Sequence, residues 1–280
     1  METKRYCLDL QNSIDSIAIG VFDGMHLAHQ KLFSALSENG AILIIENNLS
    51  TLTPKDFRKH FTNREIFYYA LSEIKHLTGE QFVEKLKSDF KNLKKIVVGY
   101  DFQFGIDRSC DIVDLKKLFL GEVVIIDEVL LDNFSVHSRY IREYIKNGEI
   151  ELANKLLGHP YKIEGVKIKG QGIGKKEFVA TINLITTDFL LPSEGIYVTK
   201  TTILDKTYNS VTFLGHRVST DGTFAIETHI LDCDINFEDG VVIIDFYKKL
   251  RNNQKFNSFI ELKQQIFDDI KEAKRYFHER

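Results

Sequence analysis

The sequence predicts an α/β plus β protein of two parts, with a parallel sheet in the N-terminal part and a small antiparallel barrel with a terminal helix in the C-terminal part. Two patterns lead to this prediction. Up to residue 157, short apolar runs alternate with stretches of helical periodicity, which is typical of βαβ units. From residue 161 onward, short alternating segments are separated by Gly, Asp, Asn and Ser, which indicates antiparallel strands.

Length and composition support this division. The chain has 280 residues, more than one hydrophobic core usually organises, and its 43% hydrophobic content is enough to fill two cores. The net charge is −3, with acidic and basic residues mixed along the chain, so we expect no nucleic-acid partner. Any nucleotides that this protein binds should therefore be small molecules.

The sequence also indicates the cellular compartment in which the protein is expected. No apolar run approaches the length of about 18 residues that a membrane span needs, and the N-terminal residues do not read as a signal peptide. Cys7, Cys110 and Cys233 are odd in number and far apart, which argues against a disulfide framework or a zinc site. We therefore expect a cytoplasmic protein with no membrane partner. The oligomeric state is not visible in the sequence.

The elements of the N-terminal part follow from the spacing of its apolar residues. Ile17 to Phe22 form an almost continuous apolar run, as expected for a strand buried on both faces, and helical spacing begins near Leu27. Asn39 and Gly40 are a plausible end for that helix. The remaining expected elements are a strand at 41–45, helices at 62–71 and 78–90, strands at 95–99 and 121–128, and helices at 135–147 and 149–157.

Gly158 ends the last of these helices, and His159 with Pro160 breaks the pattern. We therefore divide the chain into a domain at residues 1–158 and a domain at residues 159–280.

The C-terminal domain begins with strands and ends with a helix. The helix should run from Ser258 to Phe277, because its apolar residues form one stripe and Ser258 with Glu261 fits a capping box. It should lie across the barrel. The expected strands are at 161–169, 195–203, 211–214, 224–231 and 241–247.

The turn from strand to helix near Asp23 and Gly24 is a candidate phosphate site. Ligands bind outside the carboxyl ends of strands in an open parallel sheet, and the N–H groups at a helix start favour phosphate. His26 and His29 are three positions apart, so both could point at that phosphate from one helix face. On spacing alone, the two histidines could equally well cap or decorate the helix.

Three segments of the sequence resemble motifs of a known protein family. Residues 20–29, GVFDGMHLAH, resemble the G-x-F-D-G-x-H-x-G-H motif of the bifunctional riboflavin kinase and FMN adenylyltransferase family. Residues 99–105, GYDFQFG, resemble its G-x-D-F-x-F-G segment. Ser138 and Arg142 match its phosphate-holding signature S-S-T-x-I-R. The resemblance implies a Rossmann-like nucleotidyltransferase domain followed by a riboflavin-kinase-like barrel.

In the first domain, the resemblance implies a role for each matched position. His26 and His29 would stabilise charge on the phosphates, and Ser138 with Arg142 would hold the triphosphate of ATP. Asp101 could order a loop beside the flavin. Phe102 and Phe104 could press on a flavin or adenine ring, although at least one of them could be an ordinary core residue. The other implied ATP-binding residues are Gly20, Phe22, Asp23 and Gly24.

The second domain carries weaker matches. The glycine-rich segment 170–176 leads into Thr181 and Asn183, which resemble the end of the kinase motif G-F-P-T-A-N, where the family uses Thr and Asn to hold Mg²⁺. Glu227 would be the general base, although a residue on an alternating strand could simply face solvent. Arg251 would bind the flavin. The implied phosphate-binding residues of the glycine-rich segment are Gly170, Gly174 and Lys175.

Several positions depart from the family pattern. Ala28 replaces the glycine between the two histidines, and Arg139 replaces a threonine after Ser138. In the kinase motif, Phe178, Ala180 and Ile182 replace a glycine, a proline and an alanine. Further departures are His137, Asn253 in place of an acid, and the segment 215–219 in place of a Pro-Thr pair.

The resemblance therefore implies a transferase of FAD biosynthesis. The second domain would phosphorylate riboflavin with Mg²⁺ and ATP as co-substrate, and the first would join the FMN product to a second ATP, releasing FAD and pyrophosphate. The departures leave alternatives open: an FMN adenylyltransferase with an inactive kinase domain, a non-catalytic flavin-binding regulator, or another nucleotidyltransferase with an unrelated barrel.

Overall fold

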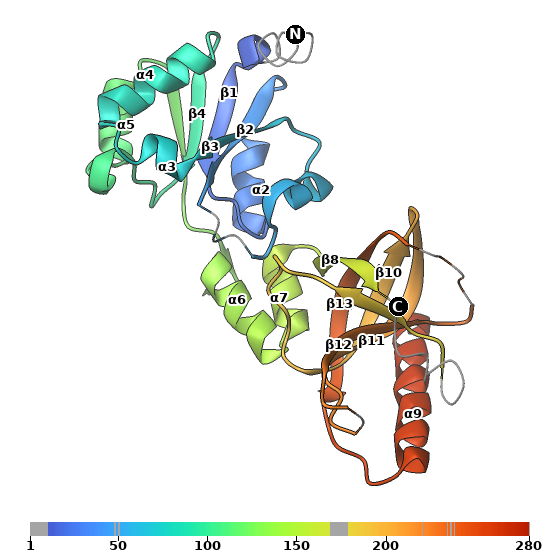
Figure 1. Cartoon of the computed structure of the whole chain (residues 1–280). Coiled ribbons are helices and arrows are strands. Elements are labelled where there is room, and N and C mark those ends of the chain that lie inside the picture. Colours follow the sequence, from blue (N-terminus) through green and yellow to red (C-terminus); the bar gives the residue numbers. More distant parts are fainter. Residues whose placement is uncertain are drawn as a thin grey trace. The chain divides into compact units, whose positions relative to one another are not determined.

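The computed structural model describes residues 11–47, 49, 51–168, 179–219, 221–233, 235, 237 and 239–279 (Figure 1). The chain forms two compact units, which we call unit 1 (Met1–His137) and unit 2 (Ser138–Arg280). Helices α6 (Ser138–Asn147) and α7 (Ile150–Leu157) belong to unit 2, because they pack together and α7 packs on the barrel. The compact units thus divide the chain before these helices, whereas the sequence-based division follows them.

Unit 1 is built on a five-stranded parallel sheet with the strand order β3-β2-β1-β4-β5. The expected parallel sheet is confirmed, and its central strand β1 is the apolar run that opens the sequence pattern. The strands are β1 (Ser16–Gly20), β2 (Gly40–Glu46), β3 (Ile66–Ala70), β4 (Lys95–Gly99) and β5 (Glu122–Ile126).

The helix expected at residues 62–71 is wrong. Ile66–Ala70 forms the edge strand β3, paired with β2, and the short helix α3 (Leu71–Ile74) follows it. The segment is rich in Ile, Phe and Tyr, which favour a pleated, half-buried strand, and it is too short for periodicity to separate strand from helix.

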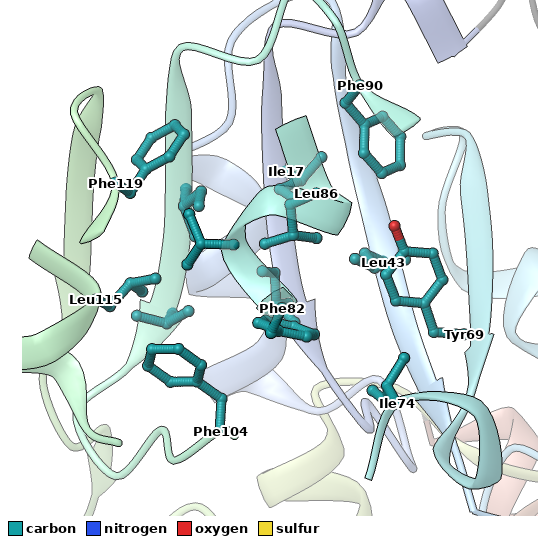
Figure 2. Packing of buried hydrophobic residues seen from close by; sticks show 14 of the residues in the cluster. Ile17, Leu43, Tyr69, Ile74, Phe82, Leu86, Phe90, Phe104, Leu115 and Phe119 are labelled. Atoms are coloured by element: carbon teal, nitrogen blue, oxygen red, sulfur yellow. The ribbon is translucent and has the colours of Figure 1, made fainter. Parts of the chain in front are cut away.

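Helices cover both faces of this sheet. Helix α2 (Leu27–Ser34) packs on one face, where it meets Ala18 of β1. Helices α4 (Gly79–Asp89) and α5 (Ile112–Leu118) pack on the other face, where they meet Ile17 (Figure 2). Successive residues of β1 therefore face opposite cores, which is why the strand is apolar from Ile17 to Ile19. The remaining short elements of unit 1 are the 3₁₀ helices at Lys55–Phe61 and Ile106–Arg108 and the hairpin of β6 (Leu130–Leu131) and β7 (Phe134–Ser135).

Unit 2 contains a closed antiparallel barrel, as expected, with the strand order β10-β11-β12-β9-β8-β13. Strand β9, which has four residues, was not among the expected strands. Its brevity and its position after a glycine-rich segment hide it from a search for alternation. The strands are β8 (Tyr161–Ile168), β9 (Ile182–Ile185), β10 (Gly195–Ile203), β11 (Lys206–His216), β12 (Phe224–Ile230) and β13 (Val241–Asn252).

A closed ring of hydroxyl groups lies inside the barrel. Thr199, Ser210, Thr201, Thr228 and Thr212 are fully buried, and each is hydrogen-bonded to the next around the ring at 2.8–3.0 Å. A hydroxyl donates one hydrogen bond and also accepts, so the five groups can satisfy one another without water. The ring joins β10, β11 and β12 from within and so fixes the strand that carries Glu227.

The terminal helix α9 (Phe259–His278) packs against β10, β11 and β13, which confirms the expected position across the barrel. Its contact is made by the C-terminal part of the apolar stripe, where Ala273 is fully buried, whereas Phe259 at the other end is 58% exposed. The Ser258 hydroxyl caps the helix by accepting from the Glu261 backbone N–H at 3.2 Å. The expected reciprocal half of the capping box is wrong, because the Glu261 carboxylate accepts from Asn257 instead.

Among the described residues, no helix is both long enough and apolar enough to cross a membrane.

Candidate active sites

Two of the predicted motifs lie at the carboxyl ends of neighbouring strands of unit 1. Strand β1 pairs with β2 on one side and β4 on the other, so the strand order reverses between β1 and β4. Ligands of open parallel sheets bind outside the carboxyl ends of the strands at such a point. Because residues 20–25 follow β1 and residues 99–105 follow β4, the fold brings the predicted phosphate and flavin segments to the same edge of the sheet.

The turn after β1 has an unusual backbone. Phe22, Gly24 and Met25 have φ values of +51°, +93° and +46°, in the left-handed region. For Phe22 and Met25 this conformation costs roughly 1–3 kcal/mol each, a strain that is common at functional sites. A Cβ atom at Gly20 would lie 2.8 Å from the Phe22 ring, so the ring packs directly on the glycine backbone.

The carboxylate of Asp23 orders this turn from within. It accepts hydrogen bonds from the backbone N–H groups of Thr51, Leu52 and Thr53 at 3.2, 3.0 and 2.9 Å. The Gly24 N–H donates to the Thr53 hydroxyl at 2.7 Å. Asp23 is 2% exposed, so its charge is used inside the protein to bind the 51–53 segment to the turn.

His26 and His29 lie together at the start of α2. His26 is the N-cap residue, and its Nδ1 accepts from the His29 backbone N–H at 3.4 Å. The two rings are stacked, with centroids 3.4 Å apart, and Phe22 packs edge-on against His29 at 5.1 Å. The capping alternative therefore holds for His26, and it coexists with a shared histidine face. Ala28 occupies the first turn of the same helix and is partly exposed.

The electrostatic surroundings of His29 suit an anion. Burial, and after it the positive charges of His26, His137 and Arg58, hold the pKa of the His29 imidazole well below its ordinary value. The Nδ1 atom of His29 is buried and has no hydrogen-bond partner. The Arg58 guanidinium is a permanent positive charge beside this ring, and it would attract a phosphate to the histidine face.

The loop after β4 contains residues with different surroundings. Phe104 is 6% exposed and packs with Phe82 in the core shown in Figure 2, whereas Phe102 is only partly buried and stacks on Phe104 at 5.6 Å. Asp101 is exposed, and its Oδ2 lies 3.9 Å from Nε2 of His137. Of the two phenylalanine rings, Phe102 is therefore the one with an accessible surface.

Arg58 is a buried cation beside the same turn. Its side chain is fully buried, with Nη1 donating to the Glu46 carboxylate at 2.9 Å and to the Lys55 carbonyl at 3.1 Å. Its Nη2 donates to the carbonyl of Val21 at 3.4 Å. Arg58 thus holds the chain between β1 and α2 and adds positive potential at His29.

Ser138 and Arg142 begin helix α6 in unit 2. They are four positions apart and therefore lie on one face of the helix. The Arg139 guanidinium, where the family pattern has a threonine, lies over the Tyr140 ring and donates to its hydroxyl at 2.6 Å. The structure thus places Ser138 with Arg142 in unit 2 and the two histidines in unit 1.

In unit 2, Asn183 and Glu227 lie directly opposite each other on the paired strands β9 and β12. Arg217 joins them. Its Nη2 donates to Asn183 Oδ1 at 2.8 Å and to Glu227 Oε1 at 2.6 Å, and its Nε donates to Glu227 Oε1 at 3.0 Å. The Glu227 side chain is 25% exposed, so it is held in an ion pair at the surface of the barrel. Thr181 comes two residues before Asn183 and is partly exposed.

The loop that carries Arg217 is held at both ends. The Glu194 carboxylate accepts from the His216 backbone N–H at 3.0 Å and from the Asn253 side chain at 2.9 Å. Hydrogen bonds from Asn253 and from His216 lower the pKa of Glu194 to about 2. Beyond Arg217, the Ser219 hydroxyl accepts a hydrogen bond from the Phe256 backbone N–H at 3.0 Å. Asn253 and the 215–219 segment, both departures from the family pattern, thus position Arg217.

The other predicted residues of unit 2 have different environments. The Arg251 guanidinium donates to both oxygens of Asp269 on α9, with Nη2–Oδ2 at 2.7 Å, so it ties that helix to β13. Ile182 is buried on β9, and the carbonyl of Ala180 lies 2.8 Å from Nδ1 of His229. The predicted residues Gly170, Gly174 and Lys175, and the departure Phe178, lie outside the described residues.

Arg58, His137 and Arg217 contribute to these two sites without having been predicted. His137 and Arg217 stand in segments that depart from the family pattern, and Arg58 stands in a segment with no motif. A single basic residue outside the long helices and strands carries no periodic signal, so its partners become visible only once the strands are paired.

Comparison with known proteins identifies the second half of the chain first. Residues 157–277 match the family model of riboflavin kinase. The chain thus contains a riboflavin kinase domain that forms a barrel.

Whole-chain relatives then identify the complete protein. A bifunctional riboflavin kinase/FMN adenylyltransferase of Buchnera aphidicola from Schizaphis graminum is 31% identical, over 95% of each chain. An enzyme of Bacillus subtilis with the same name is 27% identical, over 93% of this chain and 92% of its own. This chain therefore belongs to the bifunctional riboflavin kinase/FMN adenylyltransferase family.

A solved structure supports the fold of the whole chain. The crystal structure titled as a macrolide-efflux protein from Streptococcus pneumoniae superposes with a TM-score of 0.82 at 27% identity, covering 93% of this chain and 94% of that one. The α/β unit and the barrel therefore occur together in another chain of similar length.

Proposed function

We propose that the edge of unit 1 beyond β1 and β4 is the adenylyl-transfer site and that the face of unit 2 around Asn183 and Glu227 is the kinase site. As a member of its family, the chain is a transferase that makes FMN from riboflavin and FAD from FMN, with ATP as the second substrate. The observation that carries the assignment of the kinase site is the pairing of Asn183 with Glu227 across β9 and β12. Two predicted kinase residues, distant in sequence, meet there.

In the kinase reaction, Glu227 acts as the general base. Its carboxylate takes the proton of the ribityl 5′-hydroxyl while that oxygen bonds to the γ-phosphorus of ATP and the bond to the β-phosphate oxygen breaks, leaving ADP. The ion pair with the Arg217 guanidinium holds the Glu227 carboxylate in one orientation, which a base needs. Arg251 is proposed to contact the flavin through N–H groups that its ion pair with Asp269 does not use.

Mg²⁺ fits this site on the chemistry of the donors. Thr181 and Asn183 offer neutral oxygens and Glu227 offers a carboxylate, which are the ligand types that Mg²⁺ prefers, and the Arg217 guanidinium lies between Asn183 and Glu227. Neither this site nor any other part of the described chain contains a group of three His, Cys, Asp or Glu side chains that could hold a metal ion, so the proposed ligands are mainly neutral oxygens. We propose that Thr181 and Asn183 hold the ion, which when bound neutralises charge on the phosphates.

In the adenylyl transfer, an FMN phosphate oxygen attacks the α-phosphorus of ATP and pyrophosphate leaves. The attacking phosphate is already ionised, so this step needs no general base. His26, His29 and the N–H groups at the start of α2 stabilise the phosphate charge. For Ser138 and Arg142 of unit 2, the contact with the triphosphate stays a prediction from their match to the family signature. Phe102 and Asp101 lie beside the flavin, and Asp23, Gly20, Phe22 and Gly24 keep the turn in shape. The ATP requirement agrees with the cytoplasmic location that we propose from the sequence.

The test is a product assay with purified full-length protein. With riboflavin, Mg²⁺ and ATP, chromatography should show FMN and then FAD, and FMN given alone should also become FAD. Conversion of FMN but not of riboflavin would indicate an inactive kinase domain. Flavin binding without turnover would contradict both site assignments and leave a regulator.

A further inference from the structure

Arg217 makes more contacts than the task of holding Glu227 requires. Nη2 is shared between Asn183 Oδ1 and Glu227 Oε1, while Nε donates to Glu227 alone. On the other side, Nη1 donates to the Thr223 hydroxyl at 2.8 Å and lies 3.7 Å from an Asp221 carboxylate oxygen. The side chain is 18% exposed, so this guanidinium is built into the site.

The position of Nη2 conflicts with a metal ion on Asn183. A divalent cation on Asn183 would bind the same Oδ1 atom, at about 2.0–2.1 Å for Mg²⁺, and would therefore lie next to the guanidinium. A guanidinium cannot be deprotonated in a protein, so it cannot make room by losing its charge. Two cations that compete for one amide oxygen and one carboxylate repel each other at short range, so one must give up Asn183 before the other binds.

Nucleotide phosphates can relieve this competition, because they give the Arg217 guanidinium another hydrogen-bond acceptor. Arg forms strong, often bidentate, hydrogen bonds with phosphate oxygens. The Nε–Glu227 bond can persist while Nη2 changes its acceptor from Asn183 to a phosphate oxygen. The loop that carries Arg217 is held by Glu194 and Asn253, so the exchange involves the side chain and leaves the backbone in place.

We propose that Arg217 is a resident cation of the kinase site, which positions Glu227 and competes with divalent metal for Asn183. Metal therefore binds the kinase site together with the nucleotide and only weakly without it. This inference rests on the proposed kinase site, and it assigns to Arg217 a positioning role as well as control over metal entry.

Metal binding without nucleotide gives the direct test. We would titrate Mn²⁺ into the full-length protein and measure free Mn²⁺ by electron paramagnetic resonance. Arg217→Met should bind one Mn²⁺ at least about tenfold more tightly than wild type, because a positive charge beside the metal is gone. Arg275→Met, at an exposed position of α9, should bind as wild type does. Adding Asn183→Ala to Arg217→Met should abolish the gain.

Unchanged Mn²⁺ affinity in Arg217→Met, or a gain that survives Asn183→Ala, would overturn the inference. If the methionine variant does not fold, Arg217→Gln removes the same charge and keeps a hydrogen-bond donor for Glu227. Its Mn²⁺ affinity, with and without Asn183→Ala, then tests the inference in the same way.

Kinetics separate this inference from the proposed site itself. In Arg217→Met, FMN formation should saturate at lower Mg²⁺ while kcat falls, Arg217→Lys should recover part of kcat, and FAD formation from FMN should be unchanged. Retained FMN formation in both Asn183→Ala and Glu227→Gln would show that the kinase site is misassigned. Loss in those two variants with no change in Mg²⁺ dependence for Arg217→Met would reject the role of Arg217 alone.

Discussion

The two proposed sites are built in opposite ways. The site in unit 1 is a local one, in which a strained turn and the first turn of a helix bring Phe22, Gly24, His26 and His29 together within ten residues of chain. The site in unit 2 lies on regular strands, where Asn183 and Glu227 meet through cross-strand pairing and Arg217 arrives from a loop.

This difference follows from the chemistry of the two steps. Adenylyl transfer uses a nucleophile that is already ionised, so the protein mainly has to present donors to phosphate, and the carboxylate in that turn, Asp23, is used to order backbone. Riboflavin phosphorylation uses a neutral hydroxyl, so it needs a carboxylate that stays ionised at a fixed place. Variants of one site should therefore leave the other reaction intact.

Loss of the base should have the largest effect. Glu227→Gln keeps the shape of the side chain but cannot take a proton, so FMN formation should fall by about 10²–10⁴-fold. FAD formation from FMN should be nearly unchanged. Initial rates of both reactions measure this, with Glu151→Gln on the exposed face of α7 as the matched control. An equal loss in both reactions would contradict separate sites.

Loss of one phosphate donor should have a somewhat smaller effect on the other reaction. His29→Ala should lower FAD formation from FMN by about 10²–10³-fold, the usual cost of removing one donor to developing charge. Riboflavin phosphorylation should continue at the wild-type rate. His76→Ala, at an exposed position of the same unit, is the control. Wild-type FAD formation by the His29 variant would show that the turn has been misinterpreted.

Asp23 should affect stability as well as rate. Asp23→Ala leaves three backbone N–H groups of the 51–53 segment without their carboxylate, which should lower the free energy of unfolding of unit 1 by about 1–3 kcal/mol. Urea unfolding measures the change, and Asp127→Ala serves as an exposed control. A full-strength adenylyl transfer with unchanged stability would argue that the 51–53 segment does not need this anchor.

The pH dependence of stability should be the smallest effect. Because the pKa of His29 is lower in the folded protein than in the unfolded chain, the unfolded state binds more protons once the pH falls below about 6.5. The free energy of unfolding of unit 1 should therefore decrease as the pH falls below about 6.5, and His29 should cause no pH dependence above that value. Thermal unfolding of wild type and His29→Gln between pH 5 and 8 measures this. A parallel pH dependence in the two proteins would exclude His29 as the source.

The sequence pattern could predict much of the fold because its signals are local. The strand at 17–20 is apolar at every position since it is covered on both faces, and the helix at 79–89 begins at Thr78 with a complete capping box. The 66–70 segment shows the limit, because its four β-branched and aromatic residues fit a strand or a helix until a neighbouring strand pairs with them.

The candidate sites divide in the same way. The histidine turn is contiguous, so its residues and their shared face could be predicted from 20–29 alone. The partners of Glu227 could not, because Arg217 is placed by hydrogen bonds of Glu194 and Asn253, which come from separate strands and loops. Arg251 shows the converse case, since a matching motif predicts a ligand contact while the structure adds an ion pair with Asp269.

Mixing the two inactive variants tests the central claim, two separate sites on one chain, most directly. Neither Glu227→Gln nor His29→Ala should convert riboflavin to FAD alone, the first because it makes no FMN and the second because it cannot use FMN. Mixed with riboflavin, Mg²⁺ and ATP, they should form FAD, because FMN released by the His29 variant is a substrate for the Glu227 variant. If the mixture of two folded variants forms no FAD, while each retains its remaining single reaction, the two sites do not act independently as proposed.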